Sequence, residues 1–299
     1  MRILITGASG LVGTALTTYL QSRRHTVVSL ARTRSKEHPW WDISTGELDW
    51  GANPHFDAVI HLAGENIASG RWNAAKKERI RMSRVSGTTL LAQCLSEKEV
   101  KPELFICCSA VGFYGDRGDE ELTEQSSPGS GFLSQVCQEW EAACAPAIEA
   151  GIRTVNMRLG MVLSPNGGAL SKMLFPFRLG LGGPAGSGRQ FMSWIHIDDL
   201  CSAVAHIIDK TSLSGPVNFV APQSVRNKEF TLILGKLLQR PAVLPAPALA
   251  LRLILGEMAN ALLLSSARVL PQKLLDSGFR FSHPDLEGAL QHSTNRKRD

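Results

Sequence analysis

The 299-residue sequence predicts an α/β protein built on a doubly wound parallel sheet. Three observations support this prediction. A short apolar run at the N-terminus leads directly into a glycine-rich loop at residues 6–13. Further apolar runs then alternate with helical segments as far as residue 159. These runs are apolar on both faces, which is typical of strands in a parallel sheet that helices cover on both sides.

The elements follow in order along the chain. The first strand is expected at residues 1–5, and the glycine loop opens a first helix that ends near Arg23. Apolar residues in that helix recur at the spacing of one helical face. Later apolar runs predict strands at residues 26–31, 58–62, 104–108 and 154–158. Helices are expected at about 74–95 and 133–150. This alternation is that of a Rossmann-type fold.

The alternation stops after Gly160. Residues 164–190 are rich in glycine and proline, and sheet-like runs return at 193–197 and 216–220. The remaining segments are expected to be helical, at residues 229–238, 247–264, 272–277 and 284–290. We assign residues 1–163, completed by about 191–222, to a Rossmann domain that binds a nucleotide. Residues 164–190 and 223–299 are expected to form a smaller, mainly helical lobe that binds substrate over the carboxyl ends of the strands.

The glycine loop is the strongest functional signal. Glycine lets the backbone turn tightly and approach a phosphate closely. We expect Gly7 to permit the turn, Gly10 to let the backbone reach a pyrophosphate, and Gly13 to let the helix lie on the strand. An ordinary glycine turn is the alternative, but the position between a strand and a helix favours a dinucleotide site. The contacts predicted here are Gly7, Ser9, Gly10, Leu11, Val12 and Gly13.

The end of the second predicted strand indicates which dinucleotide binds. A site for NAD usually has an acidic residue here, which holds the ribose 2′-hydroxyl. Residues 29–36 contain no acid, and Arg32 is the first of three cations in this stretch. A guanidinium matches the oxygens of a 2′-phosphate. We therefore predict NADP as the cofactor, with Arg32 the principal contact beside Ala31; the alternative is that these cations lie on a solvated loop. Small residues at the end of the next strand suit backbone near a ribose: Leu62, Ala63 and Gly64.

Composition argues against several classes of function. The net charge is +5, and the only basic block is Arg296–Arg298, so nucleic-acid binding is not expected. The apolar stretch at 241–264 is interrupted by prolines and charges, and we expect no membrane span. Six cysteines have no framework spacing, and no cluster has metal-ligand spacing. Because a strand begins at the first residue, no signal peptide is expected, and we place the protein in the cytoplasm.

Several motifs together resemble the extended branch of the short-chain dehydrogenase/reductases, which contains the nucleotide-sugar epimerases. The segments that carry this resemblance are T-G-A-S-G-L-V-G at 6–13, H-L-A-G at 61–64, R-V-S-G-T at 84–88, C-S-A-V-G-F-Y-G at 108–115 and W-I-H-I-D-D at 194–199. More narrowly, residues 62–67, 71–72, 175–184 and 186–190 are similar to the little-characterised "epimerase-family protein" branch. The resemblance implies NADP binding, with Arg84 and Val162 as further cofactor contacts and Asp42 against the adenine.

The resemblance fails at the positions that perform proton chemistry. The family uses a tyrosine with a lysine four residues later, and a serine or threonine hydroxyl. This chain has only Tyr19 and Tyr114, and neither is followed by such a lysine. Alignment on Trp140 and Glu141 places Leu133 at the tyrosine, Cys137 at the lysine and Ala110 at the hydroxyl, with Ser109 one residue earlier. The usual mechanism is therefore not expected.

Four residues are predicted to contact a substrate: Glu65, Tyr114, Arg189 and Trp194. Each has a structural alternative. Glu65 would cap a helix or lie in solvent, the tyrosine would pack, and the other two would belong to the packing of the lobe. Cys137 is interpreted as an inert helix thiol.

In the W-I-H-I-D-D segment, His196 is expected to be a hydrogen-bonded strand residue. Asp198 and Asp199 are expected to cap a helix that starts near Leu200.

Two functions of different class remain open. The first is an NADP-dependent oxidoreductase or epimerase that acts on a small molecule, with sugar nucleotides as the suggested class. The alternative is a catalytically silent NADP-binding sensor or scaffold protein. A homodimer is left open, since residues 248–264 would present an amphipathic face to a partner or to a second copy. Core packing is the other explanation of that face.

Overall fold

A central sheet of six parallel strands organises the protein. The computed structural model describes residues 1–210 and 212–295. The strands lie in the order β12-β8-β6-β5-β1-β2, and every neighbouring pair is parallel. Their bounds are β1 Arg2–Thr6, β2 Thr26–Leu30, β5 Ala58–His61, β6 Leu104–Ala110, β8 Arg153–Leu159 and β12 Gly215–Phe219. The predicted doubly wound α/β fold is confirmed.

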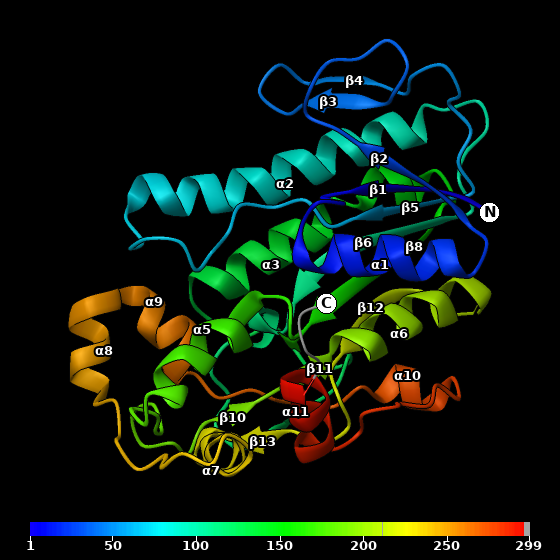
Figure 1. Cartoon of the computed structure of the whole chain (residues 1–299). Coiled ribbons are helices and arrows are strands. Elements are labelled where there is room, and N and C mark those ends of the chain that lie inside the picture. The colour runs from blue at the N-terminus through cyan, green and yellow to red at the C-terminus, as the bar shows by residue number, and fades with distance from the viewer. Residues whose placement is uncertain (211, 296–299) are drawn as a thin grey trace.

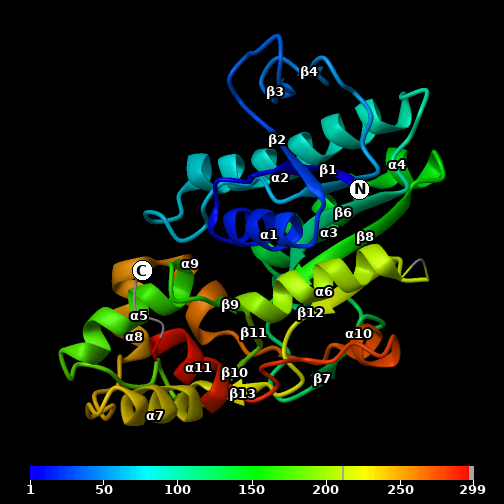
Figure 2. The same cartoon turned by 45° about the vertical axis from the view of Figure 1, so that its right-hand side comes forward.

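Helices cover both faces of this sheet (Figures 1 and 2). On one face, α1 (Leu11–Ser22) and α6 (Ile197–Asp209) bury an aliphatic cluster that includes Leu16, Leu20 and Val204. On the other face lie α2 (Ala74–Ser96), α3 (Phe132–Ala142) and α4 (Ala145–Glu149), whose buried side chains include those of Leu91 and Trp140. The strands are therefore buried on both faces, as their continuous apolar runs require.

Two local features differ from the sequence expectation. The helix expected at 133–150 is divided into α3 and α4, with Pro146 in the first turn of α4, where its missing N–H costs no helical hydrogen bond. A hairpin of β3 (Trp40–Asp42) and β4 (Glu47–Asp49) follows β2 and was not predicted. Trp41 anchors this hairpin because its side chain is buried in the cluster beneath α2.

The segment at 164–190 contains a helix that the glycine and proline content concealed. Helix α5 (Gly168–Arg178) buries Leu170, Leu174 and Phe177 in a third apolar cluster. The same cluster takes side chains from α7 (Asn227–Leu237) and α11 (Leu286–Asn295). The boundary between the two predicted parts of the chain stays a prediction.

Short strand pairs and helices connect these elements. The pairs are β9 (Met161–Leu163) with β11 (Trp194–His196), β10 (Phe191–Met192) with β13 (Val225–Arg226), and β7 (Glu121–Leu122) with β14 (Arg268–Val269). The short helices are η1 (Val111–Tyr114) and α10 (Gln272–Asp276). Within the described residues, no helix combines the length and the apolar character that crossing a membrane requires.

The helix expected at 247–264 is broken at Gly256, whose φ is +65°. It forms α8 (Ala248–Leu255), α9 (Glu257–Ala259) and η2 (Asn260–Leu264). Helix α8 buries none of its residues, and Leu249, Leu253 and Ile254 are each about two-thirds exposed, at 67%, 68% and 66%. Core packing therefore does not explain the apolar face of α8, and the predicted contact with a partner or second copy stays a prediction.

Candidate functional site

The glycine loop joins the carboxyl end of β1 to the N-terminus of α1. Gly7 has a φ of +69°, which a residue with a side chain rarely adopts. Gly13 is buried, and a Cβ there would fall on the Gly7 carbonyl oxygen and the Ala8 backbone. Both glycines are therefore required by the packing of the loop itself. The roles predicted for them, a tight turn and a close approach of helix to strand, agree with this geometry.

Gly10 has a different environment. Its φ is −77°, and a Cβ would meet only the Gly7 carbonyl oxygen, at 3.3 Å. The residue is exposed, as is Ser9. Thr14 is the first residue whose N–H reaches a carbonyl of the helix, that of Gly10 at 2.9 Å, so the N–H groups of Leu11 and Val12 are available to a ligand. No acidic side chain lies in this first turn to neutralise the helix dipole. The loop is arranged to receive an anion.

Arg32 is exposed just beyond β2, where the structure leaves its charge uncompensated. Within residues 1–210 and 212–295, no hydrogen bond or ion pair engages its side chain. Arg34 differs, because its guanidinium pairs with Glu47 and lies 4.8 Å from the ring centroid of Trp40. The hairpin that holds Arg34 also fixes Ala31, whose carbonyl accepts from the Trp41 N–H at 2.9 Å. Of the arginines predicted near the 2′-position, Arg32 alone remains available.

The Asp42 carboxylate is occupied within the hairpin. Its Oδ1 accepts from the N–H and the hydroxyl of Ser44, at 2.9 and 2.6 Å. These hydrogen bonds lower the pKa of Asp42. The predicted adenine contact is therefore not favoured by this geometry.

A buried polar pair connects the ends of β1 and β5. The Thr6 hydroxyl oxygen accepts from the N–H groups of Leu62 and Ala63, each at 3.1 Å, and lies 2.6 Å from His61 Nδ1. Thr6 therefore donates its own hydrogen to the imidazole. Burial lowers the pKa of His61 to about 3, so the ring is neutral. This arrangement fixes the backbone of Leu62, Ala63 and Gly64 beside the glycine loop: a Cβ on Gly7 would come 2.9 Å from the Ala63 nitrogen.

A group of charged side chains lies beyond the end of β5. Arg84 donates to the Glu65 carbonyl at 3.1 Å, and its guanidinium lies 3.3 Å from where a Cβ on Gly64 would be. Lys76, with a side chain only 6% exposed, donates to Glu65 Oε1 at 2.6 Å and to Ser69 at 2.8 Å. The Lys76 contact lowers the pKa of Glu65, which is an ionised carboxylate at neutral pH. Its side chain is 37% exposed and can reach a ligand.

Val162 and Leu11 both lie close to Gly168. A Cβ on Gly168 would lie 2.9 Å from Leu11 Cδ2 and 3.7 Å from the Val162 carbonyl oxygen. Strand β9, which contains Val162, pairs with Ile195 of β11. The fold thus brings these predicted cofactor residues together at the N-terminus of α1, although they are far apart in sequence.

The residues predicted at the family's proton-transfer positions are apolar or buried. Leu133 packs with its Cβ 3.4 Å from where a Cβ on Gly112 would be. Cys137 is 3% exposed, and burial raises the pKa of its thiol to about 12. It is therefore a neutral thiol near pH 7, as the inert interpretation predicted. Ala110 ends β6 and has no hydroxyl to offer.

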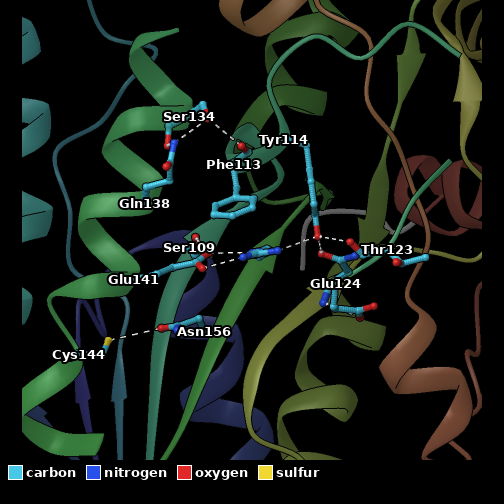
Figure 3. A network of polar contacts seen from close by, with 12 residues as sticks. Ser109, Phe113, Tyr114, Thr123, Glu124, Ser134, Gln138, Glu141, Cys144 and Asn156 are labelled. Atoms are coloured by element: carbon cyan, nitrogen blue, oxygen red, sulfur yellow. Dashed lines mark hydrogen bonds and ion pairs between the residues drawn. The ribbon is translucent and has the colours of Figure 1, made fainter. Parts of the chain in front are cut away.

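A buried ionic network engages Ser109, the residue before Ala110 (Figure 3). Ser109 donates to Glu141 Oε1 at 2.7 Å, and Glu141 accepts two bonds from Arg158, each at 2.8 Å. Arg158 also donates to the Tyr114 hydroxyl oxygen at 2.9 Å, and its guanidinium lies 3.5 Å from the ring centroid of Phe113. Each of these polar groups has a partner within the network. The network therefore holds β6, β8 and α3 together rather than facing a ligand.

Two predicted substrate contacts are wrong in this structure. Tyr114 is fully buried, and its hydroxyl also contacts the Thr123 carbonyl at 3.0 Å and Asn218 Oδ1 at 2.7 Å. Burial raises the pKa of Tyr114. Trp194 is likewise 0% exposed and packs in the third apolar cluster. Both side chains are enclosed by protein, which supports the packing alternative for each. Arg189 is exposed, and its carbonyl accepts from Arg226 at 2.5 Å; its substrate contact stays a prediction.

The capping roles predicted after β11 are also wrong. Helix α6 begins at Ile197, and His196 is its N-cap, with Nδ1 accepting from the Asp198 N–H at 3.2 Å. His196 is also the last residue of β11, as its predicted strand position requires. Asp198 and Asp199 lie in the first turn of the helix. The Asp199 carboxylate is buried and accepts from the N–H groups of Ser282 and His283, at 2.7 and 2.9 Å.

An open cleft lies beside the N-terminus of α3. Its volume is about 390 Å³, and Lys77 of α2, Phe132 of α3 and Glu257 of α9 lie along it. The Lys77 ammonium pairs with Glu257 at 2.9 Å, so the α2 side and the C-terminal segment meet across the cleft. Phe132 precedes Leu133, so the cleft lies next to the residue that we predicted at the family's tyrosine position. This position suits a substrate that lies under the C-terminal segment.

Sequence reasoning missed two contributors to the site. Lys76 was not singled out within the helix expected at 74–95, yet it is buried against Glu65. The Thr6–His61 pair gave no signal beyond two polar residues in apolar strands. A lysine at the start of the helix that follows Glu65 was the available hint, since a buried ammonium needs a partner of opposite charge.

Comparison with known proteins gives the chain clear relatives. Residues 3–220 match the NAD dependent epimerase/dehydratase family, and residues 246–293 match a domain of unknown function, DUF1731. The epimerase family protein MT2273 of Mycobacterium tuberculosis is 42% identical over 296 residues, which cover 98% of both chains. The human epimerase family protein SDR39U1 is 38% identical over 294 residues, covering 97% of this chain and 99% of that protein.

Solved structures agree with the sequence relatives. The crystal structure of human SDR39U1 with NADPH superimposes with a TM-score of 0.91 at 35% identity, covering 99% of this chain and 100% of that one. The UDP-glucose 4-epimerase of Thermus thermophilus, in complex with NAD, has a TM-score of 0.78 at 19% identity, covering 99% and 100%. At that identity the second likeness concerns the fold alone.

Proposed function

The chain belongs to the NAD dependent epimerase/dehydratase family, and from this premise we propose that it is an NADP-dependent oxidoreductase or epimerase of an atypical extended type. One observation supports the proposal above all. NADP carries two anionic groups, and the chain offers a site suited to each: the open N-terminus of α1 for the pyrophosphate and the uncompensated Arg32 for the 2′-phosphate. The NADPH in the structure of human SDR39U1 supports the same assignment.

The residues present fit this cofactor. The N–H groups of Leu11 and Val12 would hold the pyrophosphate, and Arg32 would hold the 2′-phosphate. The Thr6–His61 pair fixes the strand end that leads into Ala63 and Gly64. The backbone of these two small residues would lie beside the ribose. When bound, the nicotinamide supplies the capacity to transfer hydride. The six free cysteines fit a reducing compartment, and we propose that the protein works in the cytoplasm.

We assign the proton acceptor to Glu65. Tyr114 and Cys137 are buried, whereas the Glu65 carboxylate is partly exposed. Lys76 holds it ionised, so it accepts a hydrogen bond from a substrate hydroxyl and takes the proton as that carbon is oxidised. The open cleft beside Phe132 suits a hydroxyl-bearing small molecule, and sugar nucleotides are the class we propose.

A silent NADP-binding sensor is the second candidate. Its support is specific: Leu133 and Cys137 replace the tyrosine and lysine, and Ser109 is occupied by Glu141. In that case the cofactor site would be retained while no group completes a catalytic cycle.

Oxidation of NADPH, or reduction of NADP, separates the two functions. The purified protein is mixed with cofactor and a panel of sugar nucleotides and their keto forms. Absorbance of the reduced nicotinamide is followed for net oxidation or reduction, and chromatography of the sugar nucleotides detects epimers, because an epimerase returns the hydride and leaves the cofactor unchanged. For an enzyme we expect turnover with at least one compound, reduced about 100-fold or more in Glu65→Gln with unchanged NADPH affinity. Glu99→Gln, at an exposed position on the surface, is the matched control. Binding of NADPH without turnover across the panel would favour the sensor.

A further inference from the structure

Three histidines and an aspartate gather where four segments of the chain meet. His196 ends β11, Asp198 lies in the first turn of α6, His283 precedes α11 and His292 lies within it. Figures 1 and 2 both show β11, α6 and α11 together below the central sheet. The sequence spacing predicted no metal-ligand cluster, whereas the fold brings these four residues close together. The ligand atoms come from positions that only the tertiary fold brings together.

The separations suit a shared cation. One ligand atom from each of the four residues lies within 4.8 Å of the others. Asp198 Oδ2 is 3.7 Å from His196 Nδ1 and 3.5 Å from His292 Nε2. Ligand bonds of 2.0–2.1 Å in a tetrahedral zinc site place neighbouring ligand atoms about 3.3 Å apart. These two distances are longer than charge-assisted hydrogen bonds and close to that tetrahedral edge.

The three imidazole rings form a compact group. The ring centroids of His196 and His283 are 4.0 Å apart, those of His283 and His292 are 4.7 Å apart, and those of His196 and His292 are 5.1 Å apart. His196 is fully buried, whereas the side chains of His292 and Asp198 are 39% and 43% exposed. The cluster thus has a buried floor and a solvent-facing side through which an ion can enter.

Neighbouring groups hold the ligands in place. The buried Asp199 carboxylate accepts from the His283 N–H at 2.9 Å and from the Ser282 N–H at 2.7 Å, which fixes the segment that carries His283. Such supporting contacts are typical of metal sites. A metal on His196 Nδ1 would replace the 3.2 Å bond from the Asp198 N–H, which is a long hydrogen bond. The exchange therefore costs little.

We propose that His196, Asp198, His283 and His292 form a binding site for a divalent cation of the zinc class. Imidazole nitrogens with one carboxylate oxygen are a donor set that zinc prefers, whereas calcium and magnesium prefer oxygen alone. The site joins two parts of the chain: the first two ligands lie within the epimerase-family match at 3–220, and the other two lie within the DUF1731 match at 246–293. The bound metal fastens α11 to the start of α6.

Zinc titration of the purified, chelator-treated full-length protein tests the site. We expect one zinc ion per chain by calorimetry and a higher Tm with zinc than without it. His283→Gln and His292→Gln are each expected to weaken zinc affinity at least tenfold and to abolish the rise in Tm. His38→Gln, a change of the same type at an exposed position far from the cluster in sequence, is the control and is expected to behave as the wild type.

The result has clear alternatives. Wild-type protein that takes up no zinc would overturn the proposal, as would equal zinc affinity in the wild type and in folded His283→Gln and His292→Gln variants. Circular dichroism establishes that each variant is folded; if His283→Gln is not, His292→Gln and Asp198→Asn at the solvent side decide the matter. Because zinc alone is the probe, the outcome is independent of NADP binding and turnover.

Discussion

Replacing Gly10 with alanine is expected to separate cofactor binding from stability. The backbone at Gly10 is extended with a negative φ, and the added Cβ would meet only the Gly7 carbonyl oxygen, at 3.3 Å. The protein itself therefore tolerates the methyl group, and the free energy of unfolding should change by less than about 1 kcal/mol. The same methyl group projects where the pyrophosphate must approach the first turn of α1.

The magnitude follows from the hydrogen bonds at stake. A backbone N–H bonded to a charged phosphate oxygen contributes about 1.5–3 kcal/mol. If the methyl group displaces the pyrophosphate from the N–H groups of Leu11 and Val12, even one lost bond and a weakened second amount to about 3 kcal/mol. Since about 1.4 kcal/mol corresponds to a tenfold change in Kd, Gly10→Ala should bind NADPH about 100-fold more weakly.

Fluorescence titration with NADPH and thermal unfolding measure the two effects on the same samples. Gly288→Ala is the matched control, because its Cβ would also lie 3.3 Å from an oxygen, that of Asp285, in the distant helix α11. Gly13→Ala is the opposite case and should unfold readily, since its Cβ would collide with the Gly7 and Ala8 backbone. The reasoning is refuted if Gly10→Ala binds NADPH as tightly as the wild type, or if it loses its fold.

Four further outcomes are expected. Arg32→Ala should weaken NADP binding at least tenfold while leaving NAD binding nearly unchanged, because its guanidinium is the uncompensated charge at the end of β2. Tyr114→Phe should lower the free energy of unfolding by about 1–3 kcal/mol, since it leaves buried partners without the hydroxyl, and should not alter NADPH affinity. Cys137 should resist iodoacetamide at pH 8 in the native protein, because burial raises the pKa of its thiol to about 12. Lys76→Met should raise the pKa of Glu65 and shift the acid limb of any pH–rate profile to higher pH, since the Lys76 hydrogen bond is the largest cause of the lowered pKa.

Each of these has a contrary result. An Arg32→Ala protein that retains its preference for NADP would remove this residue from the 2′-phosphate site. Unchanged stability in Tyr114→Phe would contradict the buried network of Figure 3. Rapid alkylation of native Cys137, identified by peptide mass, would show that the thiol is accessible. A pH–rate profile unaffected by Lys76→Met would separate Glu65 from the chemistry.

The central sheet and the glycine loop could be predicted from the sequence because their signals are local. The loop at 6–13 combines a strand end, three glycines and a helix start within a few residues, and each glycine has a distinct geometric role. The uncharged end of β2 and the cation at Arg32 are likewise read from one short segment. Val162 was predicted as a cofactor contact through the family resemblance, not through any local pattern, and that contact stays a prediction; the fold places it near Leu11.

Features that depend on distant partners were not accessible. Tyr114 looked like a free phenol at a strand end, but its hydroxyl is enclosed by Arg158 and by Asn218, which lies on the last strand of the sheet. Trp194 was assigned to a ligand, whereas the helices of the C-terminal segment bury it. Nothing in the spacing of the histidines near residues 196 and 283 indicates that they meet. Long-range packing decides these cases, and periodicity does not report it.

The interrupted helices show a third kind of difference. No helix was predicted within residues 164–190, which are rich in glycine and proline, yet α5 forms there, with Pro176 inside it, since Leu170, Leu174 and Phe177 have a core to enter. Conversely, Gly256 at a φ of +65° breaks the apolar segment that looked like one long helix. Tertiary burial overrides composition in the first case, and backbone geometry overrides periodicity in the second.

The most direct test of the nucleotide site is a pair of calorimetric titrations, with NADP and with NAD, on the same purified wild-type protein. One NADP per chain, bound at least tenfold more tightly than NAD, is the predicted result, a difference of about 1.4 kcal/mol in binding free energy. No measurable heat with either dinucleotide, or equal affinity for the two, would contradict the account.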